Sequence, residues 1–111
     1  MGSIISAIGT SNPSNKFSQE QIFSFMKDAH QLDNQNSRRL ESLYKGSGID
    51  FRHSVLNDFG RERGDYDFFG NDLGLEPFPT TSKRGDIFQS HALNLSLTAI
   101  EDCTKNLKNF D

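Results

Sequence analysis

The chain has 111 residues, of which 33% are hydrophobic and 24% are charged, and its formal net charge is -3 at pH 7. This length suits one domain or part of one. The charges form no basic stripe that would bind nucleic acid, and no apolar run approaches the roughly 20 residues of a membrane span. The first residues also lack the basic start and long apolar run of a signal peptide. We therefore expect a cytoplasmic protein with no nucleic-acid or membrane partner.

The first predicted element is a strand. Residues 4–8 form a short apolar run that ends at Gly9. A short run of this kind, apolar except at Ser6, indicates a strand buried on both faces. Residues 10–17 surround the dipeptide Asn12-Pro13, which indicates a polar turn.

Two helices are predicted next. Ser18 and Gln21 form a capping box in front of an apolar run, so we expect a helix over residues 18–30. Residues 33–36 are polar and indicate a break between helices. A second helix is expected over residues 37–45, because apolar residues fall on one face and glycines follow.

A strand and a long loop follow the second helix. Residues 49–56 alternate well enough to predict a strand. Residues 60–81 are expected to form a loop, and loops of this length are usually functional or poorly ordered. The loop carries an aromatic patch made of Tyr66, Phe68, Phe69 and Phe78.

The longest predicted helix starts at Arg84 or Gly85 and runs to about Asn109, without proline or internal glycine. Apolar residues recur at helical spacing and make a wide apolar side, which we expect to be buried against a sheet or another helix. Only two strands are predicted, too few for a closed layered fold. The expected class is therefore α/β with three main helices and an incomplete sheet, whose remaining strands lie beyond Asp111.

The residues whose side chains could act in catalysis or bind a metal do not form the pattern of a catalytic site. Cys103 lies several turns into the last predicted helix and follows two acidic residues. A catalytic thiolate needs a helix N-terminus or a cation, so we expect a buried structural thiol. His30, His53 and His91 lack the spacing of a metal site, and no phosphate-binding glycine loop is present. The sequence thus predicts no catalytic residue, no metal and no cofactor.

A group of cations is open to two interpretations. Arg38, Arg39 and Lys45 lie on or just after the second predicted helix. Cations one or two turns apart can share an extended polyphosphate such as that of coenzyme A. A face exposed to solvent explains the same charges, and the residues alone leave both interpretations open.

Three segments are distinctive when taken in order: SIISAIGTSNP at residues 3–13, the helix start at residues 19–26, and SGIDFRHSVL at residues 47–56. This order resembles the start of type III polyketide synthases, the chalcone and stilbene synthase family. The likeness extends to the last predicted helix and is weakest over residues 60–79.

The resemblance implies a thiolase-like fold of two similar halves, found as a homodimer, in which residues 1–111 are the N-terminal segment of the first half. It also implies an acyltransferase. A cysteine takes an acyl group from acyl-CoA, and decarboxylative Claisen condensation with malonyl-CoA extends it with help from a histidine and an asparagine. In the family these three residues follow the helix with which this chain ends, so the segment itself is expected to be inactive.

The resemblance also bears on the cations. In plant members of the family, cations on the helix before the Ser-Gly-Ile segment contact coenzyme A phosphates. Arg39 falls on one such position, Lys45 lies one residue from another, and Ser42 stands where a third cation is expected. Arg39 and Lys45 are therefore the coenzyme A phosphate candidates.

Two other functions fit the same residues. A ketoacyl synthase that starts fatty-acid synthesis shares the fold and a similar Gly-Ile-x-x-Arg segment, but takes its malonyl group from acyl carrier protein. A small non-enzymatic module that dimerises through the aromatic loop and the last helix also fits, because exposed apolar patches mark partner surfaces. In each case we expect a homo-oligomer.

Overall fold

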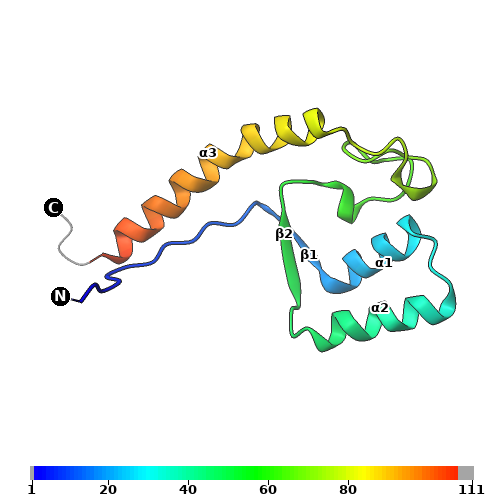
Figure 1. Ribbon diagram of the computed structural model, residues 1–111, viewed down its shortest axis with the longest axis horizontal. Coiled ribbons are helices and arrows are strands. Elements are labelled where there is room, and N and C mark those ends of the chain that lie inside the picture. Colours follow the sequence, from blue (N-terminus) through cyan, green and yellow to red (C-terminus); the bar gives the residue numbers. More distant parts are fainter. Residues whose placement is uncertain (1, 108–111) are drawn as a thin grey trace.

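The structure, a computed structural model, describes residues 2–107 of the chain. It is α/β, with three helices and a two-stranded antiparallel sheet (Figure 1). In chain order the strands and α-helices are β1 (Asn15–Ser18), α1 (Gln19–Ala29), α2 (Asn34–Gly46), β2 (Phe51–Ser54) and α3 (Thr81–Asn106), and two short 3-10 helices, η1 (Asp58–Gly60) and η2 (Leu73–Leu75), lie between β2 and α3. The expected class, with three main helices and few strands, is confirmed.

Two regions of the molecule differ in shape. We call residues 15–80 the head, and residues 2–14 together with α3 the extension. Figure 1 shows the two parts of the extension running side by side away from the head. The Cα radius of gyration is 18.5 Å, whereas a compact domain of this length has about 13 Å. The extension accounts for the difference.

Helix α1 begins where its capping box predicts. The Ser18 hydroxyl accepts a hydrogen bond from the Gln21 backbone N–H at 3.1 Å, and the Gln21 side chain accepts one from the Ser18 backbone N–H at 2.9 Å. These bonds satisfy two N–H groups that a helix start would otherwise leave free. The apolar residues of the buried face are spaced three or four apart, as helical periodicity requires. They are Ile22, Phe25 and Ala29.

Helix α2 begins at Asn34, whereas the sequence predicted a start at residue 37 after a polar break. Asp33, assigned to that break, is the N-cap of the helix: its carboxylate accepts a hydrogen bond from the Asn36 N–H at 2.7 Å. A polar residue that satisfies a free N–H of the first turn starts a helix and does not interrupt one. The predicted break over residues 33–36 was therefore wrong, and the helix ends at Gly46, one residue beyond the predicted end at residue 45.

The sheet pairs one predicted strand with one that was not predicted. Strand β2 confirms the strand expected within residues 49–56, in a shorter form. Strand β1 falls partly in residues 10–17, which were wrongly assigned wholly to a turn. The strands are antiparallel, with Phe17 opposite Arg52. Because Phe17 is the single buried residue of β1, the segment shows no apolar alternation from which a strand could be inferred.

The core of the head is aromatic. Phe25 of α1 is 4% exposed, and its ring centroid lies 4.9 Å from that of Phe59, 5.4 Å from Tyr66 and 5.7 Å from Phe69. The rings meet at tilted or edge-on angles, which aromatic pairs prefer. Leu75 is buried against the same cluster. The loop that the sequence left without structure thus supplies much of the core.

Two polar side chains order this loop. Asp58 is fully buried, and its carboxylate accepts backbone N–H bonds from three consecutive residues, 67–69, at 2.8 to 2.9 Å. Asn71 closes the preceding turn with bonds to the backbone of residues 64 and 66. A buried carboxylate with three donors is stabilising because its charge strengthens each hydrogen bond. The loop backbone is thereby fixed around the aromatic side chains.

The start of the extension corrects a prediction. Residues 4–8 were expected to form a buried strand, but they belong to no sheet within residues 2–107, and their isoleucines are 67% to 89% exposed. The backbone of Gly9 instead lies against α3, so closely that an added Cβ would stand 2.2 Å from the Ala99 carbonyl oxygen. The Thr10 N–H donates to the Asp102 carboxylate at 3.0 Å. A helix offers no ladder of hydrogen bonds, so the segment is extended but is not a strand.

Helix α3 is the longest, as predicted, but begins earlier than expected, at Thr81. The Thr80 hydroxyl caps it by accepting the Lys83 N–H at 3.1 Å. Its predicted end near Asn109 lies outside the described residues. Among the helices of residues 2–107, none is long and apolar enough to cross a membrane.

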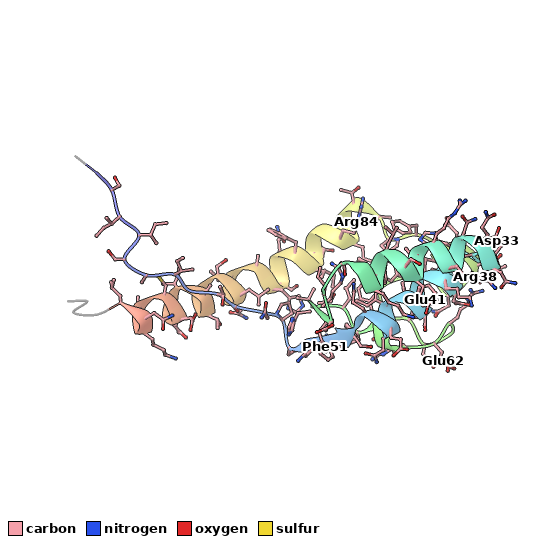
Figure 2. All side chains as sticks on the ribbon, turned by 90° about the horizontal axis from the view of Figure 1, so that it is seen from below. Asp33, Arg38, Glu41, Phe51, Glu62 and Arg84 are labelled. Carbon is pink, nitrogen blue, oxygen red and sulfur yellow. The ribbon has the colours of Figure 1, made fainter. Side chains whose placement is uncertain are left out.

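The apolar side of α3 is uncovered. No residue of the helix is buried within the described part of the chain, although burial against a sheet or helix was expected. Figure 2 shows its side chains projecting from a rod that leaves the head. The large exposed apolar residues of the helix are Phe88, Leu93, Leu97 and Ile100.

Candidate functional site

The phosphate candidate Arg39 lies beside Arg38 on the exposed surface of α2. Both side chains line one shallow surface depression with Ser42 and Leu43. Neither guanidinium makes an ion pair or hydrogen bond with another side chain in residues 2–107. Figure 2 shows Arg38 on this helix, with Asp33 nearer its start and Glu41 further along. Two unpaired guanidiniums supply several donors in a fork geometry that matches a phosphate.

The second candidate, Lys45, lies on another side of the helix. It lies six positions after Arg39, which places the two side chains about 120° apart around the axis. Lys45 lines a separate groove between α1 and α2, together with Glu20, Glu41 and Asp50. The structure therefore does not bring the two phosphate candidates together on one face.

Lys45 also has a partner of its own. Its Nζ lies 2.8 Å from Oε1 of Glu41, one helical turn earlier. This hydrogen bond, with the attraction between the charges, lowers the pKa of Glu41 and raises the pKa of Lys45. Both side chains are exposed, so water screens the pair. A phosphate that reached Lys45 would compete with the Glu41 carboxylate.

Cys103 lies within α3, as expected, and is partly buried there. The backbone of Gly9 packs against its turn of the helix, where an added Cβ would stand 2.2 Å from the Cys103 nitrogen. Cys103 lies in the last turn of α3, at the carbonyl end of the helix, which lacks the free N–H groups that stabilise a thiolate. In the described part of the chain, no group of three or more histidine, cysteine or acidic residues could hold a metal.

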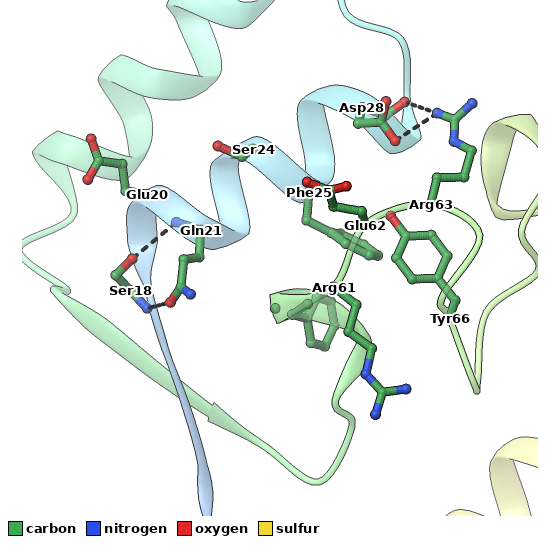
Figure 3. Close-up of a pocket in the computed structure, with 12 residues that line it drawn as sticks. Ser18, Glu20, Gln21, Ser24, Phe25, Asp28, Arg61, Glu62, Arg63 and Tyr66 are labelled. Carbon is green, nitrogen blue, oxygen red and sulfur yellow. Dashed lines mark hydrogen bonds and ion pairs between the residues drawn. The ribbon is translucent and has the colours of Figure 1, made fainter.

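Sequence reasoning missed a cavity between α1 and the loop that follows β2 (Figure 3). Arg61 and Arg63 of this loop had no predicted partner, but Arg63 pairs with Asp28 at 2.7 Å and Arg61 pairs with Asp67. Asp28 and Arg63 are separated by 35 residues in the chain. No spacing rule connects residues so far apart, so only the folded chain reveals the pair.

Comparisons with known proteins bear on the fold. No family model matches the sequence, and none of the curated proteins does. A solved structure does match: PKS-I from the brown alga Ectocarpus siliculosus, a type III polyketide synthase, with a TM-score of 0.70 and 21% identity. The match covers 94% of this chain and 27% of that chain.

At this identity the likeness shows the fold and nothing more. The chain has the architecture of part of a thiolase-like fold, as the sequence segments indicated. It spans about a quarter of the length of PKS-I, since the match covers 27% of that chain.

Proposed function

We propose that this chain is the N-terminal segment of an acyltransferase related to type III polyketide synthases. The parent enzyme condenses acyl-CoA with malonyl-CoA by decarboxylative Claisen chemistry, and the segment alone is inactive. One observation carries the proposal: the chain matches PKS-I over 94% of its length with a TM-score of 0.70. The three sequence segments that resemble the family are independent support.

The chemistry is assigned to residues outside this chain. A cysteine thiolate attacks the acyl thioester, and a histidine and an asparagine stabilise the negative charge that develops on decarboxylation. Cys103 is not the nucleophile, because it lies in the last turn of α3 and follows Asp102, whose carboxylate accepts the Thr10 N–H. The contribution of this chain is to scaffold the fold and to bind substrate.

The substrate contact that we assign to the chain is the phosphate of coenzyme A. Arg39 is the first candidate because its guanidinium has no acidic partner in residues 2–107. Lys45 is the second, and Glu41 competes for it. In the product of the whole reading frame, we expect Arg39→Gln to raise the Kd for coenzyme A about fivefold, as loss of an exposed ion pair does. Arg84→Gln, an exposed control at the start of α3, should leave the Kd unchanged.

The decisive test of the activity is an assay of that whole product with acyl-CoA and malonyl-CoA. We expect release of carbon dioxide and coenzyme A together with an extended acyl chain. Absence of a downstream cysteine, histidine and asparagine in that order, or absence of condensation, would contradict the proposal. Strict dependence on malonyl-acyl carrier protein would favour the ketoacyl synthase alternative instead.

One observation favours the non-enzymatic alternative. The apolar side of α3 and the isoleucines before Gly9 are exposed within the described chain, as a dimerisation surface would be before pairing. Sedimentation of the 111-residue chain together with the reading frame separates the two functions. A stable, cooperatively unfolding dimer from a gene that ends at this length would support the module. A longer reading frame with the three catalytic residues would support the acyltransferase.

A further inference from the structure

The start of α3 carries two cations where a helix ordinarily disfavours them. Lys83 and Arg84 follow the N-cap Thr80 by three and four positions, and the first turn contains no acidic residue. The free N–H groups of a helix start carry partial positive charge, so a cation beside them is destabilising. The Arg84 guanidinium, labelled in Figure 2, donates to the Thr81 hydroxyl at 3.2 Å and so stays within the helix. Lys83 has partners outside it.

The Lys83 ammonium group binds the loop that follows β2. Its Nζ donates to the carbonyl oxygen of Phe68 at 2.7 Å and to that of Asp67 at 3.3 Å. The same atom lies 5.3 Å from the centroid of the Phe68 ring, a distance at which a cation is attracted to an aromatic face. Within residues 2–107, no other side chain of α3 makes a hydrogen bond or ion pair with the head.

Two peptide groups of the loop are hydrogen-bonded at both ends. Their carbonyl oxygens, on Asp67 and Phe68, accept from Lys83. Their N–H groups, on Phe68 and Phe69, donate to the buried Asp58 carboxylate at 2.9 and 2.8 Å. The negative end of each peptide dipole thus meets the ammonium group, and the positive end meets the carboxylate. Hydrogen bonds joined in this way polarise and strengthen one another.

The Asp67 carboxylate does not take part in this arrangement. It is paired with Arg61, and Lys83 makes no ion pair with any carboxylate in the described part of the chain. Lys83 therefore acts on the loop backbone itself. Its contacts offset the unfavourable position of its charge at the helix start.

We propose that Lys83 couples α3 to the core of the head through these two peptide groups. In doing so it sets the direction in which α3, with its uncovered apolar side, leaves the head (Figure 1). Lys83 is a positioning residue in this role, and Asp58 is its counterpart on the other side of the loop backbone. The proposal does not depend on the acyltransferase function.

The first test compares two substitutions in the 111-residue chain. Lys83→Gln and Arg84→Gln remove the same charge from the same turn, so an effect of helix polarity alone would be similar in both. We expect Lys83→Gln to speed amide exchange at residues 67–69 about three- to tenfold, as the loss of one or two hydrogen bonds does. It should also change the angle between α1 and α3, measured by residual dipolar couplings. Arg84→Gln should change neither.

A conservative variant separates this role from a general loss of stability. Lys83→Arg keeps the charge and several N–H donors, so we expect it to retain the slow exchange at residues 67–69 and the angle between the helices. Circular dichroism of each variant verifies that it is folded.

The coupling to the core is tested by a double-mutant cycle. Asp58→Asn removes the charge of the carboxylate with little change of shape. We expect Lys83→Gln to change the equilibrium constant of unfolding about fivefold less in the Asp58→Asn background than in the unaltered chain, because the two charges act on the same peptide groups.

Two results would overturn the proposal. One is a folded Lys83→Gln chain whose exchange at residues 67–69 and whose angle between α1 and α3 match those of Arg84→Gln. The other is an equal effect of Lys83→Gln in both backgrounds of the cycle, which would show that Lys83 and Asp58 act independently.

Discussion

The head and the extension bury their side chains very differently. Every buried residue in the described part of the chain lies in the head, around Phe25 and Asp58. The extension has none, although α3 is the longest helix and has a wide apolar side. Regular secondary structure and burial therefore do not coincide in this molecule. The irregular loop is part of a core, and the most regular helix is not.

The physical reason lies in the partners available to each region. Rings from α1 and the loop after β2 contact one another within the head. Among the described residues, the segment around Gly9 lies against the last turns of α3, and Leu95 lines a depression with Val55 and residues 11–14, but none of these contacts buries a residue of the helix. An exposed leucine or isoleucine would contribute about 1.5 to 3 kcal/mol if it were buried. The rest of a thiolase-like fold is the covering that we propose for this side of α3.

The largest expected effect is on the core of the head. We expect Phe25→Ala to lower the free energy of unfolding by about 3 to 5 kcal/mol, because it removes the ring at the centre of the aromatic cluster. Leu97→Ala on α3, where the side chain is 47% exposed, should cost less than about 0.5 kcal/mol apart from helix propensity. Urea denaturation of both variants measures this contrast. Equal losses of unfolding free energy in the two variants would contradict the difference between the head and the extension.

The next effect concerns the buried carboxylate. Asp58→Ala leaves three backbone N–H groups of the loop without their acceptor. We expect a loss of about 3 kcal/mol, since hydrogen bonds to a charged group contribute about 1.5 to 3 kcal/mol each and water replaces some of them. Asp65→Ala, an exposed acidic residue of the same loop, is the control. A melting temperature of Asp58→Ala equal to that of the control would contradict the role of Asp58.

A smaller effect should be confined to the extension. Gly9→Ala adds a Cβ that would overlap the backbone of α3 at Ala99, so the segment must move away from the helix. We expect faster amide exchange at Thr10, whose N–H is held by Asp102, and a change in unfolding free energy below about 1 kcal/mol. Gly85→Ala, where an added Cβ meets nothing within 4 Å, is the matched control. A large global loss in Gly9→Ala would show that the head depends on the extension.

The smallest effect is a dependence on pH. Because the folded pKa of Tyr66 is raised above its ordinary value of 10.0, the unfolded chain loses this proton first as the pH rises. The contribution of Tyr66 to the free energy of unfolding is therefore fully present below about pH 10, and it is lost as the pH rises through the folded pKa. Tyr66→Phe should show a shallower decline above pH 10 than the unaltered chain. Parallel curves would mean that Tyr66 contributes nothing to the decline.

Local signals in the sequence predicted most of the helices. The capping box at Ser18 and the apolar periodicity of α3 depend on residues only a few positions apart, so both can be recognised in the sequence alone. The start of α2 was missed because Asp33 was taken as a break and not as a cap. Residues 4–8 were wrongly expected to be a buried strand. An apolar run shows that a segment can be buried, but it does not show which part of the molecule, if any, lies against it.

The site was less predictable for a related reason. Sequence spacing suggested that Arg39 and Lys45 could act together. In the structure they lie on different sides of α2, and Lys45 forms an ion pair with Glu41. The cavity beside Tyr66 is lined by residues that are far apart in the chain, so no local sequence pattern predicts it. Whether Arg39 and Lys45 bind phosphate stays a prediction.

Amide hydrogen exchange of α1 and α3 in the 111-residue chain tests the contrast between the head and the extension most directly. We expect the amides of α1, the helix that carries Phe25, to exchange at least about tenfold more slowly than those of α3, which has no residue buried within the described part of the chain. Equally slow exchange in both helices would contradict it, because α3 would then be covered and stabilised within this chain or between copies of it.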